Sequence, residues 1–245
     1  MQVKIFSSAE RAARALALDV ARTIKARPAT VLGLPTGRTP IPLYQELARL
    51  HDRGRVSFSR VTTFNLDEFV GVPRRDSGSY HAFMRRHLFD HVDLPATAIH
   101  FLDGDADDLE RECRRYERAI ARAGGIDVQL LGLGTNGHIG FNEPAPELIA
   151  RTHRTRLRAP TRRANAGLFG HRRAVPREAL SMGMATILQA RRIVLIATGR
   201  QKARCVERLV RGPITPQLPA SFLQLHANAA VWLDRDAASR LSAAP

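Results

Sequence analysis

The stretch DVQLLGLGTNGHIGFNEP, at residues 127–144, joins a short apolar run to a loop rich in glycine. The run at 128–133 is mostly apolar on both of its faces, which is typical of a strand covered from both sides. Such strands form parallel sheets with helices on each face, and ligands bind beyond the carboxyl ends of those strands. The stretch therefore predicts an α/β fold with a binding site in the loop that follows residue 133.

Short apolar runs alternate with longer amphipathic segments along the rest of the chain. Because helices separate the strands, we predict a three-layer α/β/α sandwich with a mostly parallel sheet. At 245 residues the chain can bury a substantial core, and we expect one domain over residues 1–245. The predicted strands are Met1–Phe6, Thr30–Leu34, Val61–Asn65, Ile99–Leu102, Val128–Leu133, Ile193–Ala197 and Ala229–Leu233, and the predicted helices are Ala9–Arg27, Pro40–Asp52, Tyr80–His91, Asp107–Ala123 and Gln201–Arg211.

A formal net charge of +15 raises the alternative of a nucleic-acid-binding protein or a non-catalytic sugar-phosphate sensor. The basic residues are nearly all arginines, scattered through predicted helices among apolar and acidic residues rather than gathered in one tail. We therefore expect solvated helix faces and no nucleic-acid partner. The densest stretch, Arg151 to Arg173, includes Arg172 and is predicted to attract a small anionic substrate.

The two cysteines, Cys113 and Cys205, lie in predicted charged helices without the spacing of a metal site or the density of a disulfide scaffold. No window of about 18 residues is continuously apolar, and the N-terminus is typical of a strand followed by an amphipathic helix. We expect a cytoplasmic protein with no signal peptide and no membrane partner.

The first loop of chemical interest, GLPTGRTP at residues 33–40, lies between a predicted strand and a predicted helix. Free backbone N–H groups and the helix dipole favour an anion at such a helix start. Thr39 is a candidate helix cap and Pro40 suits the first helical position. The loop lacks both the P-loop and the dinucleotide-binding patterns, and a plain strand-to-helix turn remains the alternative.

The second loop, LDEFVG at residues 66–71, places two adjacent carboxylates at the end of a buried strand. Side chains of adjacent residues on an extended chain point to opposite faces. We therefore expect only one of Asp67 and Glu68 to face a substrate, while the other holds the loop. A helix cap or a solvated turn is the alternative interpretation of this pair.

The third loop, residues 132–144, combines glycines with His138, Glu143 and two amide side chains. Histidine titrates near neutral pH, and a nearby carboxylate can hold its ring in one tautomer and stabilise the imidazolium. This loop predicts acid–base catalysis, with a structural or solvated histidine as the alternative.

Taken together, LGLPTGRTP, FNLDEFVG, LGLGTNGHIGFNEP and TGRQKA closely resemble the glucosamine-6-phosphate deaminase (isomerase) family over nearly the whole chain. The resemblance implies a Rossmann-like fold and an enzyme of amino-sugar metabolism, of the hydrolase class, that converts glucosamine 6-phosphate to fructose 6-phosphate and ammonia. The related 6-phosphogluconolactonases typically lack the Phe-Asn-Glu-Pro sequence found here at residues 141–144. A lactonase-like hydrolase, or a deaminase of another, even unphosphorylated, amino sugar, is the alternative.

The resemblance also implies a role for individual residues. Asp67 matches the general base that moves a proton between C2 and C1, His138 the residue that opens the sugar ring, and Glu143 the carboxylate partner of that histidine. Lys202 matches a phosphate-binding lysine. No cofactor and no metal are expected, because the carbonyl of the open sugar is its own electron sink. Thr36, Gly37, Arg38 and Thr39 are the further phosphate-binding candidates, and since relatives include both monomers and larger assemblies, a homo-oligomer is left open.

The chain departs from the family pattern at two positions. Asn136 replaces an aspartate found in some members, so it can donate a hydrogen bond beside His138 but adds no charge. Gly167 replaces an arginine that usually grips the substrate phosphate. We hypothesise that Arg38 supplies the missing guanidinium, with Arg158 and Arg163 as further candidates.

Overall fold

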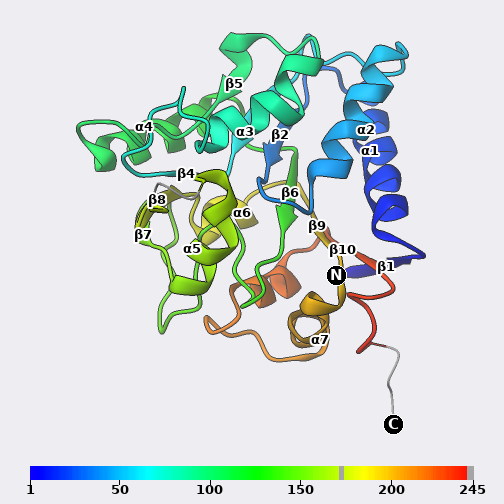
Figure 1. Ribbon diagram of the computed structural model, residues 1–245. Coiled ribbons are helices and arrows are strands. Elements are labelled where there is room, and N and C mark those ends of the chain that lie inside the picture. Colours follow the sequence, from blue (N-terminus) through cyan, green and yellow to red (C-terminus); the bar gives the residue numbers. More distant parts are fainter. Residues whose placement is uncertain (171–173, 242–245) are drawn as a thin grey trace.

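A seven-stranded, wholly parallel sheet forms the centre of the computed structural model, which describes residues 1–170 and 174–241 (Figure 1). Every strand of this sheet was predicted from the sequence, with ends that differ by one or two residues. The strand order is β1-β10-β9-β6-β2-β3-β5. The bounds are β1 Gln2–Phe6, β2 Val31–Leu34, β3 Thr62–Asn65, β5 Ile99–His100, β6 Val128–Gly132, β9 Arg192–Ala197 and β10 Ala229–Asp234.

Helices cover both faces of the sheet, which confirms the predicted three-layer architecture. Alternate residues of the central strands enter two separate cores: Leu130 packs in the core with α1 Ala9–Ala26, α2 Ile41–Asp52 and α3 Tyr80–His87. Leu131 packs in the core on the other face. That second core receives α4 Leu109–Arg122, α6 Met184–Leu188 and α7 Ala203–Arg211.

The predicted helices are present, but several begin or end differently. The predicted helix Tyr80–His91 ends at His87 and is followed by a separate 3-10 turn, Phe89–His91. The helix predicted from Gln201 begins at Ala203, after the 3-10 turn Arg200–Lys202. The prediction of a Thr39 cap is wrong: α2 begins at Ile41, Pro40 precedes the first helical residue, and no side chain caps this end.

A second, three-stranded antiparallel sheet lies beside the large one and was not predicted (Figure 1). It consists of β4 Asp67–Phe69, β8 Glu178–Ser181 and β7 His153–Arg156. Leu66 joins the two sheets, because its N–H donates to Leu34 O of β2 and its carbonyl accepts from Met182 N. The segment after β3, expected to be a loop, is therefore a strand that is fixed from both sides.

Close backbone contacts hold the far end of β4. The N–H of Gly71 donates to Gly104 O at 2.7 Å. A Cβ atom on Gly104 would lie 1.9 Å from the carbonyl oxygen of Phe69, the last residue of β4. Only glycine fits at position 104 without moving the strand that carries Asp67.

We predict that Gly104→Ala lowers the free energy of unfolding by about 2–3 kcal/mol, because the added methyl group forces the backbone of β4 to move. Gly167→Ala is the matched control, since a Cβ there meets no atom within 4 Å. Urea unfolding curves of the two variants give the comparison. Equal stability of the two variants would show that β4 is not held by this contact.

Candidate active site

A cavity of about 540 Å³ opens at the carboxyl ends of the central strands. All three loops singled out in the sequence contribute to it, together with the turn after β9. Its lining includes Thr36, Gly37, Arg38, Thr39, Asp67, His138 and Lys202. The structure thus brings the predicted base, the predicted histidine and the predicted phosphate-binding residues into one cavity.

Asp67 is the first residue of β4 and is only 6% exposed. Burial and, to a lesser degree, the neighbouring charge of Glu68 together raise the pKa of its carboxyl to about 8, against the opposing effect of a hydrogen bond from the Thr36 hydroxyl. Its Oδ1 atom has no hydrogen-bond partner among the described residues. The site therefore holds a proton acceptor that is poorly solvated and has a free lone pair.

Glu68 faces away from the cavity, as the alternation of side chains along a strand predicts. Its carboxylate accepts hydrogen bonds at 2.9 Å from the backbone N–H groups of Phe69, Tyr80 and His81. Burial raises the pKa of Glu68 to about 7 against the opposing effect of these three donors. Glu68 thereby ties β4 to the start of α3, while Asp67 lines the cavity.

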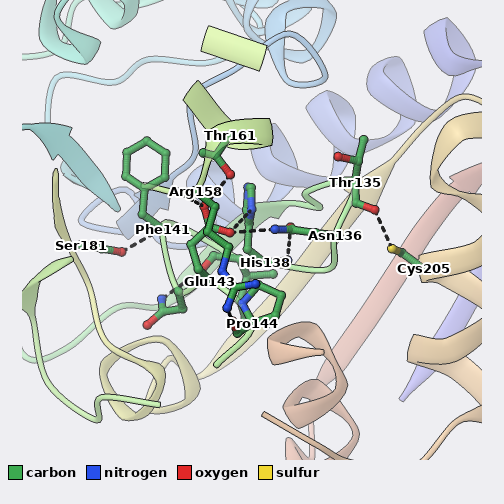
Figure 2. Close-up of polar contacts among 12 residues, drawn as sticks. Thr135, Asn136, His138, Phe141, Glu143, Pro144, Arg158, Thr161, Ser181 and Cys205 are labelled. Carbon is green, nitrogen blue, oxygen red and sulfur yellow. Dashed lines mark hydrogen bonds and ion pairs between the residues drawn. The ribbon is translucent and has the colours of Figure 1, made fainter. Parts of the chain in front are cut away.

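His138 and Glu143 lie side by side in the loop after β6, with His138 Nδ1 3.5 Å from Glu143 Oε2 (Figure 2). The Nδ2 group of Asn136 donates to Glu143 Oε2 at 2.7 Å, and Asn136 Oδ1 accepts from the backbone N–H of His138 at 3.2 Å. Asn136 thus joins the carboxylate to the backbone of the histidine. Because a Cβ on Gly134 would lie 2.5 Å from the His138 ring, glycine at 134 is what lets the ring lie there.

Glu143 is held as a carboxylate. Burial acts to raise its pKa, but the nearby His138, with hydrogen bonds from Thr161 and Asn136, lowers the pKa to about 2. The Thr161 hydroxyl and the backbone N–H of Arg158 both donate to Oε1 (Figure 2). The Glu143 carboxylate faces Nδ1 of His138 and thereby favours one orientation of the ring.

The basic groups of the cavity are Arg38 and Lys202. Burial, together with the positive charge of Arg38, lowers the pKa of Lys202 to about 8, while the thiol of Cys205 acts to raise it. Two cations that face the same space destabilise each other, and an anion bound between them relieves both. The backbone at Gly37, with φ of 99°, belongs to the same region and suits glycine alone. This part of the cavity has the chemistry of an anion site.

The two other arginines considered for the phosphate lie elsewhere. Arg158 is exposed, and its guanidinium donates to the Pro144 carbonyl. Arg163 is exposed and, like Gly167, is not among the described residues that line the cavity. Arg172 lies outside the described residues. Of the arginines considered, Arg38 is the one that the structure places at the cavity.

Sequence reasoning missed several residues of the lining. Tyr80 borders the cavity from the first turn of α3, and its hydroxyl donates to Asn165 Oδ1 at 2.9 Å. Nothing in the local sequence of the helix distinguishes Tyr80 from a core aromatic. Other missed residues that line the cavity are Phe141, Pro160, Thr161, Leu168, Thr198 and Gln201.

A larger groove, of about 1000 Å³, runs between α4 and β7 and contains none of the predicted catalytic residues. Within residues 1–170 and 174–241, no group of His, Cys, Asp and Glu side chains is arranged to hold a metal ion. No helix in the same part of the chain is both long and apolar enough to cross a membrane.

Comparison with known proteins identifies the kind of protein that has these features. Residues 6–232 match the family described as glucosamine-6-phosphate isomerases/6-phosphogluconolactonase. The glucosamine-6-phosphate deaminase of Halothermothrix orenii is 47% identical over 98% of this chain and 100% of its own length. The deaminase of Rhodopirellula baltica is 50% identical over 98% of this chain and 96% of its own length.

Solved structures give the same result at the level of the fold. A structure described as a monomeric glucosamine-6-phosphate deaminase superposes with a TM-score of 0.94 at 45% identity, covering 98% of this chain and 99% of the other. The 6-phosphogluconolactonase of Trypanosoma cruzi shares the fold, with a TM-score of 0.79 over 99% of this chain and 97% of its own, but is only 19% identical. The chain therefore belongs to the glucosamine-6-phosphate isomerase/6-phosphogluconolactonase family, and within it to the glucosamine-6-phosphate deaminases.

Proposed function

We propose that the protein converts glucosamine 6-phosphate and water to fructose 6-phosphate and ammonia. The observation that carries this proposal is the convergence in one cavity of a buried carboxyl, a histidine paired with a carboxylate, and two cations. Each group fits a separate need of the reaction: a base for a carbon-bound proton, an acid–base for the ring, and a partner for the phosphate. Full-length relatives at 43–50% identity carry the name of this activity.

His138 begins the reaction by moving protons between the ring oxygen and the hydroxyl at C1, so that the sugar opens to an aldehyde. The imidazolium formed on the way is stabilised by the Glu143 carboxylate at 3.5 Å. Asp67 then removes the proton from C2, the electron pair of the C–H bond forms a C1=C2 double bond, and the C1 oxygen takes a proton from the ammonium group on C2, which gives an enolamine. Asp67 returns the proton to C1, which leaves an iminium at C2. Water adds there and ammonia departs, giving the ketone.

The substrate supplies part of the activation of Asp67. In the empty site burial keeps the pKa of Asp67 at about 8, so much of the carboxyl is protonated at neutral pH. The substrate carries its amino group on C2, next to the proton to be removed. A positive charge beside Asp67 favours its ionised form. The base is therefore generated where and when the amino sugar binds.

The phosphate is assigned to Arg38, Lys202 and the backbone around Gly37 and Thr39. Arg38 takes the place of the guanidinium that is absent at Gly167, which is exposed. An arginine can donate two parallel hydrogen bonds to phosphate oxygens, whereas a lysine acts as a point charge. The two side chains together suit a dianionic group.

Replacement of the base should abolish turnover without unfolding the protein. We expect Asp67→Asn to lower kcat for glucosamine 6-phosphate by about 10³-fold, because an amide cannot accept the C2 proton. The assay follows both ammonia and fructose 6-phosphate, with hydrolysis of 6-phosphogluconolactone measured in parallel. The exposed Asp236→Asn is the matched control. Wild-type turnover by Asp67→Asn, or lactone hydrolysis without ammonia release, would contradict the proposed function.

The same substitution should change how stability depends on pH. Folded Asp67 keeps its proton up to about pH 8, whereas the unfolded chain loses it near pH 4. Between these values the unfolded state binds fewer protons, so this group makes the wild-type protein less stable as the pH rises. We expect the Tm of Asp67→Asn minus that of the wild type to increase from pH 4 to pH 8. A difference that stays constant over this range would argue against a buried, protonated Asp67.

Arg38 should act on substrate binding rather than on the chemical step. We expect Arg38→Ala to raise KM for glucosamine 6-phosphate by about tenfold with little change in kcat, since it removes a charge-assisted contact to the phosphate. Steady-state kinetics of Arg38→Ala and of the control Arg163→Ala test this. If Arg163→Ala shows the larger effect, the assignment of the phosphate to Arg38 is wrong.

A further inference from the structure

A buried carboxylate outside the cavity, Asp234, lies at the carboxyl end of β10 and is 6% exposed. Strand β10 pairs in parallel with β9, in register at Leu233 and Ala197. Asp234 therefore lies beside the turn that follows β9, and that turn leads to Lys202. The mechanism above makes no use of this residue.

The contacts of Asp234 are backbone N–H groups. Gly199 N–H lies 3.1 Å from Oδ1 and 3.0 Å from Oδ2, and Ala237 N–H donates to Oδ1 at 2.8 Å. In the part of the chain that the structure describes, no Lys, Arg or His forms an ion pair with Asp234. A buried carboxylate without a cation depends on such hydrogen bonds for its stability. The position of the Gly199 turn and the stability of the Asp234 carboxylate therefore depend on each other.

The Gly199 turn connects the Asp234 carboxylate to a residue that lines the cavity. Gly199 has φ of 86°, and its carbonyl accepts a hydrogen bond from the backbone N–H of Lys202 at 3.0 Å. Two hydrogen bonds in series, through the one residue Gly199, therefore connect the Asp234 carboxylate to the backbone of Lys202. Thr198 and Gln201, on the same turn, also line the cavity.

We propose that Asp234 is a positioning residue for substrate binding: it fixes the Gly199 turn and thereby aims the Lys202 ammonium at the phosphate. The inference rests on the proposed function, in which Lys202 binds that group. Asp234 itself does not touch the substrate. Its loss should weaken phosphate binding and leave proton transfer at Asp67 and His138 almost unchanged.

A purely structural role is the competing explanation, since Asp234 also anchors the turn that follows β10. Its backbone carbonyl accepts from Ala238 N, and its side chain from Ala237 N. A structural anchor would lower Tm or the fraction of active protein when removed, and would leave KM and phosphate affinity unchanged. The test must therefore separate binding constants from stability.

The experiment compares Asp234→Ala, Asp234→Asn, Lys202→Met, the double variant Asp234→Ala/Lys202→Met and the exposed control Asp236→Asn. For each, KM and kcat are measured with glucosamine 6-phosphate, Ki with inorganic phosphate as a competitor, and Tm. We expect Asp234→Ala to raise both KM and Ki by about tenfold, the effect of one lost hydrogen bond to a charged group, with kcat within about twofold. Asp234→Asn keeps one acceptor oxygen and should show a smaller rise, about threefold.

The double variant decides whether Asp234 acts through Lys202. When Lys202 is already replaced by Met, the further rise in KM and Ki caused by Asp234→Ala should be less than about twofold. The effects of substitutions at residues that act together do not add. Additive effects, or an Asp234→Ala variant with lowered Tm but unchanged KM and Ki, would overturn the inference while leaving the role of Lys202 intact. If Lys202→Met leaves KM and Ki unchanged, both the role of Asp234 and the role of Lys202 in phosphate binding are wrong. If Asp234→Ala does not fold, Asp234→Asn and its double variant with Lys202→Met answer the same question.

Discussion

The burial of the Asp67 carboxyl at the junction of two sheets is the constraint on which the rest of the site depends. Leu66 is hydrogen-bonded to β2 on one side and to Met182 on the other, so the chain passes directly from the parallel sheet into the small antiparallel one. Glu68 is then fixed to α3 by three backbone donors. Asp67, held between these two anchors, cannot turn away from the cavity toward solvent. Its raised pKa follows from that position.

Asp67 and Lys202 are influenced by different charged neighbours. The charge that acts on Asp67 is that of Glu68, whereas the charges that act on Lys202 are those of Cys205 and Arg38. Glu143 is ionised through its contacts with His138, Thr161 and Asn136. A carboxyl that stays protonated thus lines the cavity, while a carboxylate that stays charged lies beside His138, because burial dominates at Asp67 and hydrogen bonding at Glu143.

The sequence allowed the large sheet to be predicted because its strands are short apolar runs separated by amphipathic helices. The small sheet was missed since DEF at 67–69, HRTR at 153–156 and EALS at 178–181 lack the apolar pattern of a buried strand. Asp67, His138 and Glu143 were singled out because they lie in loops that follow predicted strands, whereas Lys202 was named through the resemblance to the family. Thr161 and Asp234 were not, since their roles come from contacts with residues 18 and 35 positions away. The predicted Thr39 cap failed because α2 starts one residue beyond Pro40.

Infrared difference spectroscopy directly measures whether the buried Asp67 carboxyl is protonated. The carbonyl stretch of a protonated carboxyl, assigned by subtracting the spectrum of Asp67→Asn, is followed while the pH is raised from 5 to 10. We expect this band to be present at pH 6 and to disappear with a midpoint near pH 8. A carboxyl that is already fully ionised at pH 5 would contradict it.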